Sequence, residues 1–207
     1  MGVNGSIVAC LSNGIQPNYY VITDRDFFET RMNLVEQAIR SGAHCFFSFN
    51  GLSRIAKLKP HLLNIGKISL LETVNRYYNI PQLSTIDWMS ACQNHQDLET
   101  TENSKVGWSN DLNKGVFTAN TIAYIGCQLA SFIGAKNVFI AGMDLSSPTS
   151  TSTRFYEDGP SARPTTIDTD YKKEIFPAFQ LLSKLDQPTR FWNLSVDSRL
   201  PHSTMKK

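Results

Sequence analysis

Several polar residues of this chain directly follow short β-prone runs, where the turns of a ligand-binding edge would lie. They are Asn4, Asp24, Asn50 and Asp144. In open parallel α/β sheets, ligands bind beyond the carboxyl ends of the strands. An Asn side chain offers both donors and acceptors, which suits a nucleotide base or a ribose. Each turn alone has a local explanation, because Asn-Gly is a common turn and Asp a common helix cap. Their joint placement favours a ligand site.

Two small residues strengthen this interpretation. Ser6 ends the junction Val3-Asn4-Gly5-Ser6, where it can cap a short helix over residues 7–12. Gly142 follows the predicted strand 138–141, and a glycine there lets the backbone come close to a ligand.

A candidate anion site precedes the apolar helix predicted over residues 117–133. Lys114 and Gly115 lie just before it, and Thr118, Asn120 and Thr121 would begin it. Free amides at a helix N-terminus, with a lysine nearby, favour a bound anion. Simple helix capping explains the same residues equally well.

The polar segment 146–163 carries further binding chemistry. Arg154 can pair with a carboxylate or a phosphate, and Tyr156 can donate to a phosphate oxygen. A solvated charged loop is the alternative. Among the four histidines, His202 is the candidate catalytic one, since Asp197 and Arg199 lie close to it in the sequence.

The elements expected to position these residues alternate between strand and helix, which predicts an α/β fold with a mainly parallel sheet. Helices are expected on both faces of one domain that spans residues 1–207. Strands are predicted at 19–22, 44–49, 68–71, 138–141 and 190–194, and long helices at 26–40, 117–133 and 168–185. Pro177 should end or kink the last helix near Phe176. Residues 73–115 are expected to form a lid or an acceptor-binding insertion.

Composition narrows the class further. The chain has 207 residues, a formal net charge of +2 and 41% hydrophobic residues, which is typical of a globular domain and too weakly basic to favour nucleic acid. Its four cysteines show no CxxC spacing, and its histidines show no metal-ligand spacing. No signal peptide or membrane-spanning run is visible, so we expect a cytoplasmic protein.

Six short motifs, in order and in register, resemble the lipopolysaccharide core biosynthesis proteins that include the third-Kdo transferase (Kdo, 3-deoxy-D-manno-octulosonic acid). A more distant resemblance is to the bacterial CMP-sialic-acid sialyltransferases. The motifs are Val3-Asn4-Gly5-Ser6, Tyr20-Val21-Ile22-Thr23-Asp24, Thr121-Ile122-Ala123-Tyr124, Gly142-Met143-Asp144-Leu145, Arg154-Phe155-Tyr156, and Asn193-Leu194-Ser195 with Asp197-Ser198-Arg199.

The resemblance implies a Rossmann-like, sialyltransferase-like fold and transfer of Kdo, or a related acidic keto-sugar, from a CMP donor to the lipopolysaccharide inner core. It implies that Asn4 and Asn50 contact the nucleotide and that Gly142 and Asp144 lie by the cytidine. Residues 113–115 would lie by the phosphate or sugar. The sialyltransferases work without a metal and use tyrosine hydroxyls on the phosphate, so no cofactor is expected and Tyr156 is the candidate. A lipid acceptor implies peripheral contact with the inner membrane.

The relatives begin with a further strand and a Gly-x-Gly-Pro-Ser-like loop, and we expect this chain to lack that first strand. Two alternatives follow. One is a catalytically inactive or truncated relative that still binds a nucleotide sugar. The other is a different enzyme on the same fold, such as a pterin pyrophosphokinase-like or flagellin-modifying transferase.

Overall fold

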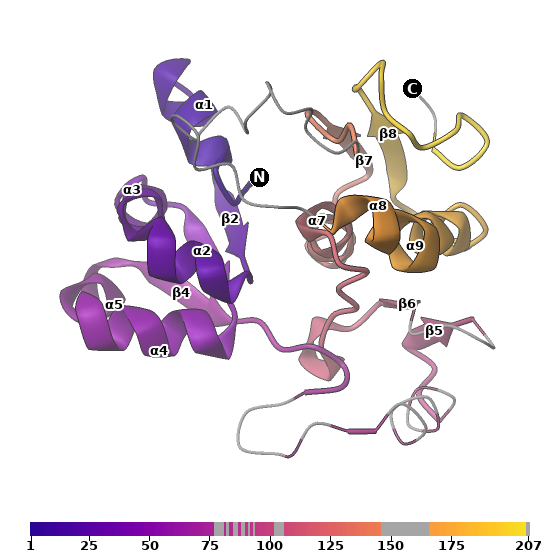
Figure 1. Ribbon diagram of the computed structural model, residues 1–207, viewed down its shortest axis with the longest axis horizontal. Coiled ribbons are helices and arrows are strands. Elements are labelled where there is room, and N and C mark those ends of the chain that lie inside the picture. Colours follow the sequence, from indigo (N-terminus) through magenta and orange to yellow (C-terminus); the bar gives the residue numbers. More distant parts are fainter. Residues whose placement is uncertain are drawn as a thin grey trace. The chain divides into compact units, whose positions relative to one another are not determined.

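A computed structural model describes residues 1–76, 94–101, 106–145 and 166–205, with residues 81, 83, 84, 87, 90 and 92 (Figure 1). The chain forms two compact units, Met1–Glu72 and Thr73–Lys207, and each is described by itself. The prediction of a single domain, with residues 73–115 as a lid, stays a prediction. In the part of the chain described, no helix has the length and apolar character needed to cross a bilayer.

The first unit contains a four-stranded parallel sheet. Its strands are β1 (Gly2–Val3), β2 (Tyr19–Ile22), β3 (His44–Phe47) and β4 (Lys67–Leu70), and they lie side by side in chain order. Aromatic and β-branched residues dominate β2 and β3, which favours extended backbone. The α/β class and the parallel sheet are therefore confirmed, and every strand of this sheet ends at the same edge.

Five helices connect these strands: α1 (Ser6–Ser12), α2 (Arg25–Thr30), α3 (Met32–Arg40), α4 (Phe49–Leu58) and α5 (His61–Ile65). Helix α3 contacts α1, α2 and α5, and α4 contacts α2 and α5; Figure 1 shows α2 to α5 on one side of the sheet. Right-handed crossovers between strands in chain order place their helices on one face. A second layer of helices is not seen among α2 to α5, and the prediction of helices on both faces stays a prediction.

Two predicted boundaries in this unit were wrong. The helix expected over residues 26–40 breaks at Arg31, whose backbone is not helical (φ −131°, ψ 34°). The break lets Phe28 pack edge-to-face on Phe47 of β3, while Val35 is buried from the separate helix α3. Strand β3 ends at Phe47, and Ser48 then caps α4, so Asn50 and Gly51 are helical rather than a turn.

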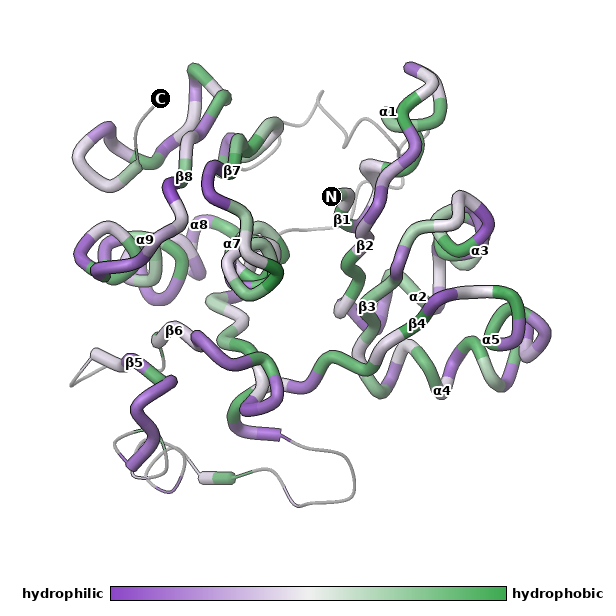
Figure 2. The backbone as a smooth tube through the Cα atoms, turned by 180° about the vertical axis from the view of Figure 1, so that it is seen from behind, coloured by the Kyte–Doolittle hydropathy of each residue, from purple (hydrophilic) through white to green (hydrophobic). Residues whose placement is uncertain are grey.

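The described part of the second unit includes two small sheets and the helices α7, α8 and α9. Strands β5 (Leu98–Thr100) and β6 (Gly107–Ser109) pair antiparallel, and β7 (Asn137–Ile140) and β8 (Arg190–Asn193) pair parallel. The helices are α7 (Ile122–Phe132), α8 (Ile167–Asp170) and α9 (Phe176–Leu182), with a 3₁₀ turn at Leu112–Lys114. Figure 2 shows α7 as mostly hydrophobic, which fits its central place in this unit's core.

Three aromatic side chains fill that core. Trp108 of β6 lies edge-on to Tyr124 of α7 at 5.6 Å, and Tyr124 lies edge-on to Phe179 of α9 at 5.3 Å. All three are fully buried, and edge-to-face pairs add to the hydrophobic stabilisation. The Tyr124 hydroxyl donates to the carbonyl of Gly107 (2.9 Å), so the core also fixes the position of β6.

A buried glutamine joins α7 to the chain before it. The Gln128 Oε1 accepts from the backbone N–H groups of Ser109 (3.2 Å) and Phe117 (3.0 Å). Its Nε2 donates to the carbonyls of Phe117 (2.7 Å) and Tyr124 (3.3 Å). Gln128 is completely buried, so one amide supplies the hydrogen bonds that backbone groups outside the regular ladders need.

The last helix shows how Pro177 is accommodated. The prediction of a kink near Phe176 is confirmed in position, but the helix continues. A π-helical turn, η2 (Tyr171–Ile175), lies between α8 and α9. Proline lacks an N–H and its ring clashes with a carbonyl one turn earlier, and a wider turn relieves both.

We predict that Gly51→Ala destabilises the first unit, although alanine is normally the better helix former. A Cβ at Gly51 would lie 2.3 Å from the Phe28 ring, which is fully buried and cannot swing away. Overpacking of this kind costs about 1–3 kcal/mol in the free energy of unfolding. Denaturant titration measures it. Ser53→Ala, at an exposed position of α4, is the control and should be neutral. A Gly51→Ala variant as stable as the control would contradict the packing.

We predict that Gln128→Leu costs about 3 kcal/mol or more, because it leaves several buried backbone groups without partners. Chemical denaturation monitored by tryptophan fluorescence reports on it, since Trp108 lies in the same core. Gln180→Leu, on the exposed side of α9, is the matched control and should change stability by less than about 0.5 kcal/mol. Equal effects of the two substitutions would show that the Gln128 bonds contribute little.

Candidate functional site

The carboxyl edge of the four-stranded sheet brings polar residues of the first unit together. Asn4 follows β1, Thr23 and Asp24 follow β2, and Ser48 follows β3. Because these three strands are parallel neighbours, the turns lie along one edge. Such edges are where ligands bind in open α/β sheets. Within this unit, Asn4 and Asp24 therefore lie at one edge of the sheet, as the sequence predicts.

Asn4 has the most unusual geometry of these residues. Its φ is 43°, a left-handed value that costs most side chains free energy. Its N–H donates to the Val21 carbonyl (3.2 Å), and its carbonyl accepts from the Tyr20 hydroxyl (2.7 Å). Its side-chain Oδ1 is buried, yet has no hydrogen-bond partner among the described residues. A buried acceptor without a partner costs stability, and such sites are often functional.

Ser6 supports Asn4 rather than capping α1 as predicted. The N-cap is Gly5, and Ser6 is the first helical residue. The Ser6 Oγ accepts from the Val3 N–H (2.7 Å) and lies 3.2 Å from the Tyr20 hydroxyl. Burial raises the pKa of Tyr20 well above its usual value, so its phenol stays protonated and can donate to Asn4. Ser6 and Tyr20 therefore fix the turn that carries Asn4.

Ser48 joins the ends of β2 and β3. Its hydroxyl donates to the Thr23 carbonyl (3.0 Å) and accepts from the Gly51 N–H (3.3 Å). Asn50 lies at the start of α4 with an exposed side chain, two strands away from Asn4. Sequence reasoning did not single out Ser48. The signal available was a serine immediately before a helical run.

A second polar edge lies at the carboxyl ends of β7 and β8. Gly142 has a φ of 75°, and among the described residues no atom lies within 4 Å of where its Cβ would stand. The next N–H, of Met143, donates to the Ser195 Oγ (2.8 Å). The Ser195 N–H in turn donates to the side chain of Asn193 (3.0 Å). These bonds join the two strand ends where the ladder stops.

Asp144 follows this junction with an exposed side chain. Its carbonyl accepts from the Arg199 N–H (3.0 Å), which brings the C-terminal segment to the strand ends. Leu145 has a left-handed φ of 59° while its side chain is buried. A strained backbone next to an exposed carboxylate is typical of functional turns.

The helix that follows Lys114 and Gly115 begins later than predicted, and the role of these two residues at an anion site stays a prediction. Helix α7 begins only at Ile122, because Ala119 and Asn120 have left-handed backbones. Lys114 ends the 3₁₀ turn instead. Gly115 has a φ of 86°, and a Cβ there would lie 2.7 Å from the backbone of Thr73, so its glycine has a structural reason.

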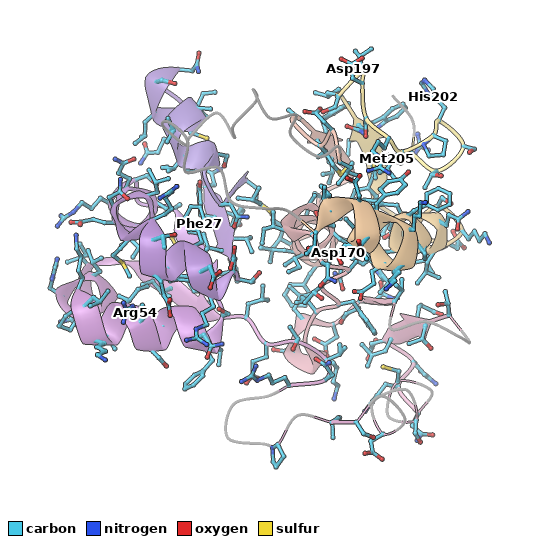
Figure 3. The ribbon with its side chains drawn as sticks, viewed as in Figure 1. Phe27, Arg54, Asp170, Asp197, His202 and Met205 are labelled. Carbon is cyan, nitrogen blue, oxygen red and sulfur yellow. The ribbon has the colours of Figure 1, made fainter. Side chains whose placement is uncertain are left out.

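The structure describes His202 but not the two residues predicted to bind the phosphate. His202 lies exposed on the C-terminal segment, where Figure 3 labels it with Asp197. Arg154 and Tyr156 lie outside the described residues. Asn4, Ser6 and Asn50 share one edge of the first unit. Gly142 and Asp144 share an edge of the second unit. Lys114, Gly115 and His202 belong to the same unit. Their proposed roles stay predictions.

Burial makes two of the cysteines poor candidates for a nucleophile. All four are free, and burial raises the pKa of Cys45 to about 12 and that of Cys92 to about 11. These two thiols remain protonated near neutral pH, and a protonated thiol is a poor nucleophile.

We predict that Asn4→Gly leaves the first unit as stable as the wild type or more so, whereas Asn4→Ala destabilises it by about 1 kcal/mol. Glycine tolerates the left-handed backbone and also removes the buried acceptor that lacks a partner. Alanine also removes the acceptor, but it tolerates the left-handed backbone less well than asparagine does, and this cost outweighs the gain. Urea titration of both variants compares them. A Gly variant clearly less stable than the Ala variant would mean that the Asn4 backbone is not strained.

Comparison with known proteins assigns the chain to a family. Residues 1–205 match the family described as 3-deoxy-D-manno-octulosonic acid transferase WaaZ. A "Probable 3-deoxy-manno-octulosonic acid transferase" of Escherichia coli (strain K12) is 24% identical over 220 residues, which cover 99% of this chain and 72% of that protein. A protein of the same name from Salmonella typhimurium (strain LT2) is 23% identical over 205 residues, covering 97% and 74%. No solved structure matches the chain. The match along nearly the whole length shows that the chain belongs to the WaaZ Kdo transferase family.

Proposed function

We propose that this protein transfers Kdo from a CMP donor to the inner core of lipopolysaccharide. The observation that carries the proposal is the family match over residues 1–205, which includes both polar edges described above. The description of that family names Kdo as the sugar that is transferred. The CMP donor and the lipopolysaccharide acceptor come from the resemblance of the sequence motifs.

The first polar edge suits the nucleotide. The buried Oδ1 of Asn4 lacks a partner, and its amide can bond a cytosine edge or a ribose hydroxyl. Asn50 is exposed on the same edge and would add a second amide. Ser6 would act indirectly, by holding the turn of Asn4 through Val3 and Tyr20.

The second polar edge offers groups that could bind a nucleotide in the same way. No described atom lies close to the Cβ position of Gly142, so a ligand can approach the backbone there. The exposed carboxylate of Asp144 can accept from the cytosine amino group or a ribose hydroxyl. Lys114 would lie near the phosphate or sugar, as the resemblance implies.

The proposed reaction is an inverting displacement at the anomeric carbon of the donor. An acceptor hydroxyl oxygen forms the new bond, and the bond from that carbon to the phosphate oxygen breaks. CMP departs with the electron pair, and a base takes the hydroxyl proton. His202 is the candidate base. Tyr156 and Arg154 would stabilise the charge that gathers on the phosphate. No metal or cofactor enters this scheme.

The acceptor implies a location. A lipid-linked Kdo acceptor would bring the protein to the cytoplasmic face of the inner membrane by peripheral contact. A catalytically inactive member that binds the nucleotide sugar is the alternative, and the assay below distinguishes it by binding without turnover.

We predict that the purified protein releases CMP from CMP-Kdo only when a Kdo-bearing lipid acceptor is present, and that CMP-sialic acid is turned over at least about tenfold less efficiently. Asn4→Gly should lower kcat/KM by about tenfold or more, because a hydrogen bond to the donor is lost while the fold is kept. Coupled detection of CMP and mass spectrometry of the lipid measure the two products.

Asn13→Gly is the matched control, since Asn13 lies exposed at the other end of α1 and bonds only locally in the described contacts. It should leave kcat/KM unchanged. Calorimetric binding of CMP without any turnover would support the inactive relative. Absence of both binding and turnover would sink the proposed function.

A further inference from the structure

Arg199 is the centre of a side-chain cluster at the second polar edge. Its backbone N–H holds the Asp144 carbonyl at 3.0 Å, and its guanidinium Nη1 donates to the Leu145 carbonyl at 3.3 Å. The same Nη1 forms an ion pair with Asp168 of α8. The turn after β7 therefore meets the C-terminal segment at this arginine.

The guanidinium is held in a defined orientation. Its central carbon lies 4.2 Å from the centre of the Tyr171 ring, a cation–π stack. The Tyr171 hydroxyl donates back to the Arg199 carbonyl at 2.7 Å, so the two residues fix each other. Tyr171 begins the π-helical turn that precedes Pro177, and such turns are frequent at functional sites.

Exposed groups lie on the segments that meet at Arg199. No described atom lies within 4 Å of the Cβ position of Gly142, and the side chains of Asp144 and Asp197 are exposed. The Arg199 side chain is 30% exposed and that of its partner Asp168 is 63% exposed. A stacked arginine with a fork of donors recognises planar or tetrahedral anions well.

Asp168 itself shows what Arg199 can hold. Its carboxylate is an anion already placed on the guanidinium, in the position that a carboxylate or phosphate oxygen of a ligand would take. An ion pair this exposed contributes little to stability, so exchanging the internal carboxylate for a ligand's would cost little.

We propose that Arg199 binds an anionic group of the substrate, exchanging Asp168 for it, and that Tyr171 positions the guanidinium for this role. The inference rests on the proposed function, because CMP-Kdo carries two such groups, the phosphate of CMP and the carboxylate of Kdo. Both present anionic oxygens to the same donors. From the sequence, Arg199 was noted as a neighbour of His202 and as part of a family motif, but no role in binding was predicted for it.

Titration calorimetry of the full chain with CMP, free Kdo and neutral cytidine tests this. Arg199→Gln should weaken binding of the anion it holds by about tenfold or more and leave cytidine binding unchanged. Asp168→Asn should tighten binding of the same anion about three- to fivefold, because the internal competitor loses its charge. A purely structural ion pair predicts no tightening. An effect on CMP alone assigns the phosphate, and an effect on Kdo alone assigns the carboxylate.

Asp197→Asn removes an equally exposed acid from the same segment and is the control for net charge; it should change none of the affinities. If Arg199→Gln does not fold, Asp168→Asn still decides the question. Wild-type binding of CMP and Kdo that Asp168→Asn leaves unchanged or weakens would overturn this inference alone. A wild-type protein that binds neither CMP nor Kdo would overturn it together with the proposed function.

Discussion

The end of a parallel strand leaves backbone groups that the sheet no longer satisfies, and this constraint shapes both polar edges. In the first unit the Tyr20 and Ser48 hydroxyls donate to the carbonyls of Asn4 and Thr23. In the second, the Ser195 hydroxyl accepts from the Met143 N–H. Buried backbone groups must be paired, so polar side chains from the neighbouring strand are required there. The same bonds fix the backbone of the turns that carry the candidate site residues.

Two of these turns store strain that the surrounding bonds maintain. Asn4 and Leu145 both have left-handed backbones without being glycine. Each is held by neighbours: Asn4 by Val21 and Tyr20, and Leu145 by burial of its side chain and by Arg199. Strain of this kind persists only where the surroundings over-determine the backbone. Both turns carry candidate ligand-binding groups. The Oδ1 of Asn4 has no partner among the described residues, and the exposed carboxylate of Asp144 precedes Leu145.

Sequence patterns located the elements better than their ends. The strand at 19–22 was predicted with its observed bounds, and those near 68, 138 and 190 were found within one residue. The helix boundaries failed at Arg31, at Ser48 and before Ile122, where packing of Phe28, capping by Ser48 and two left-handed residues changed the outcome. Hydrophobic periodicity continues through such points, because it records which residues are buried and not where the backbone turns.

The sequence by itself determined the α/β class, the parallel character of the main sheet and the family, because these follow from the alternation of elements and from motifs in register. It also marked Asn4, Gly142 and Asp144 as residues after strands. Only the tertiary structure revealed the unpartnered Oδ1 of Asn4, the Gln128 amide that serves four bonds, and the stack of Arg199 on Tyr171. These features join residues distant in the chain, and hydrogen-bond satisfaction depends on the three-dimensional surroundings that local sequence does not encode.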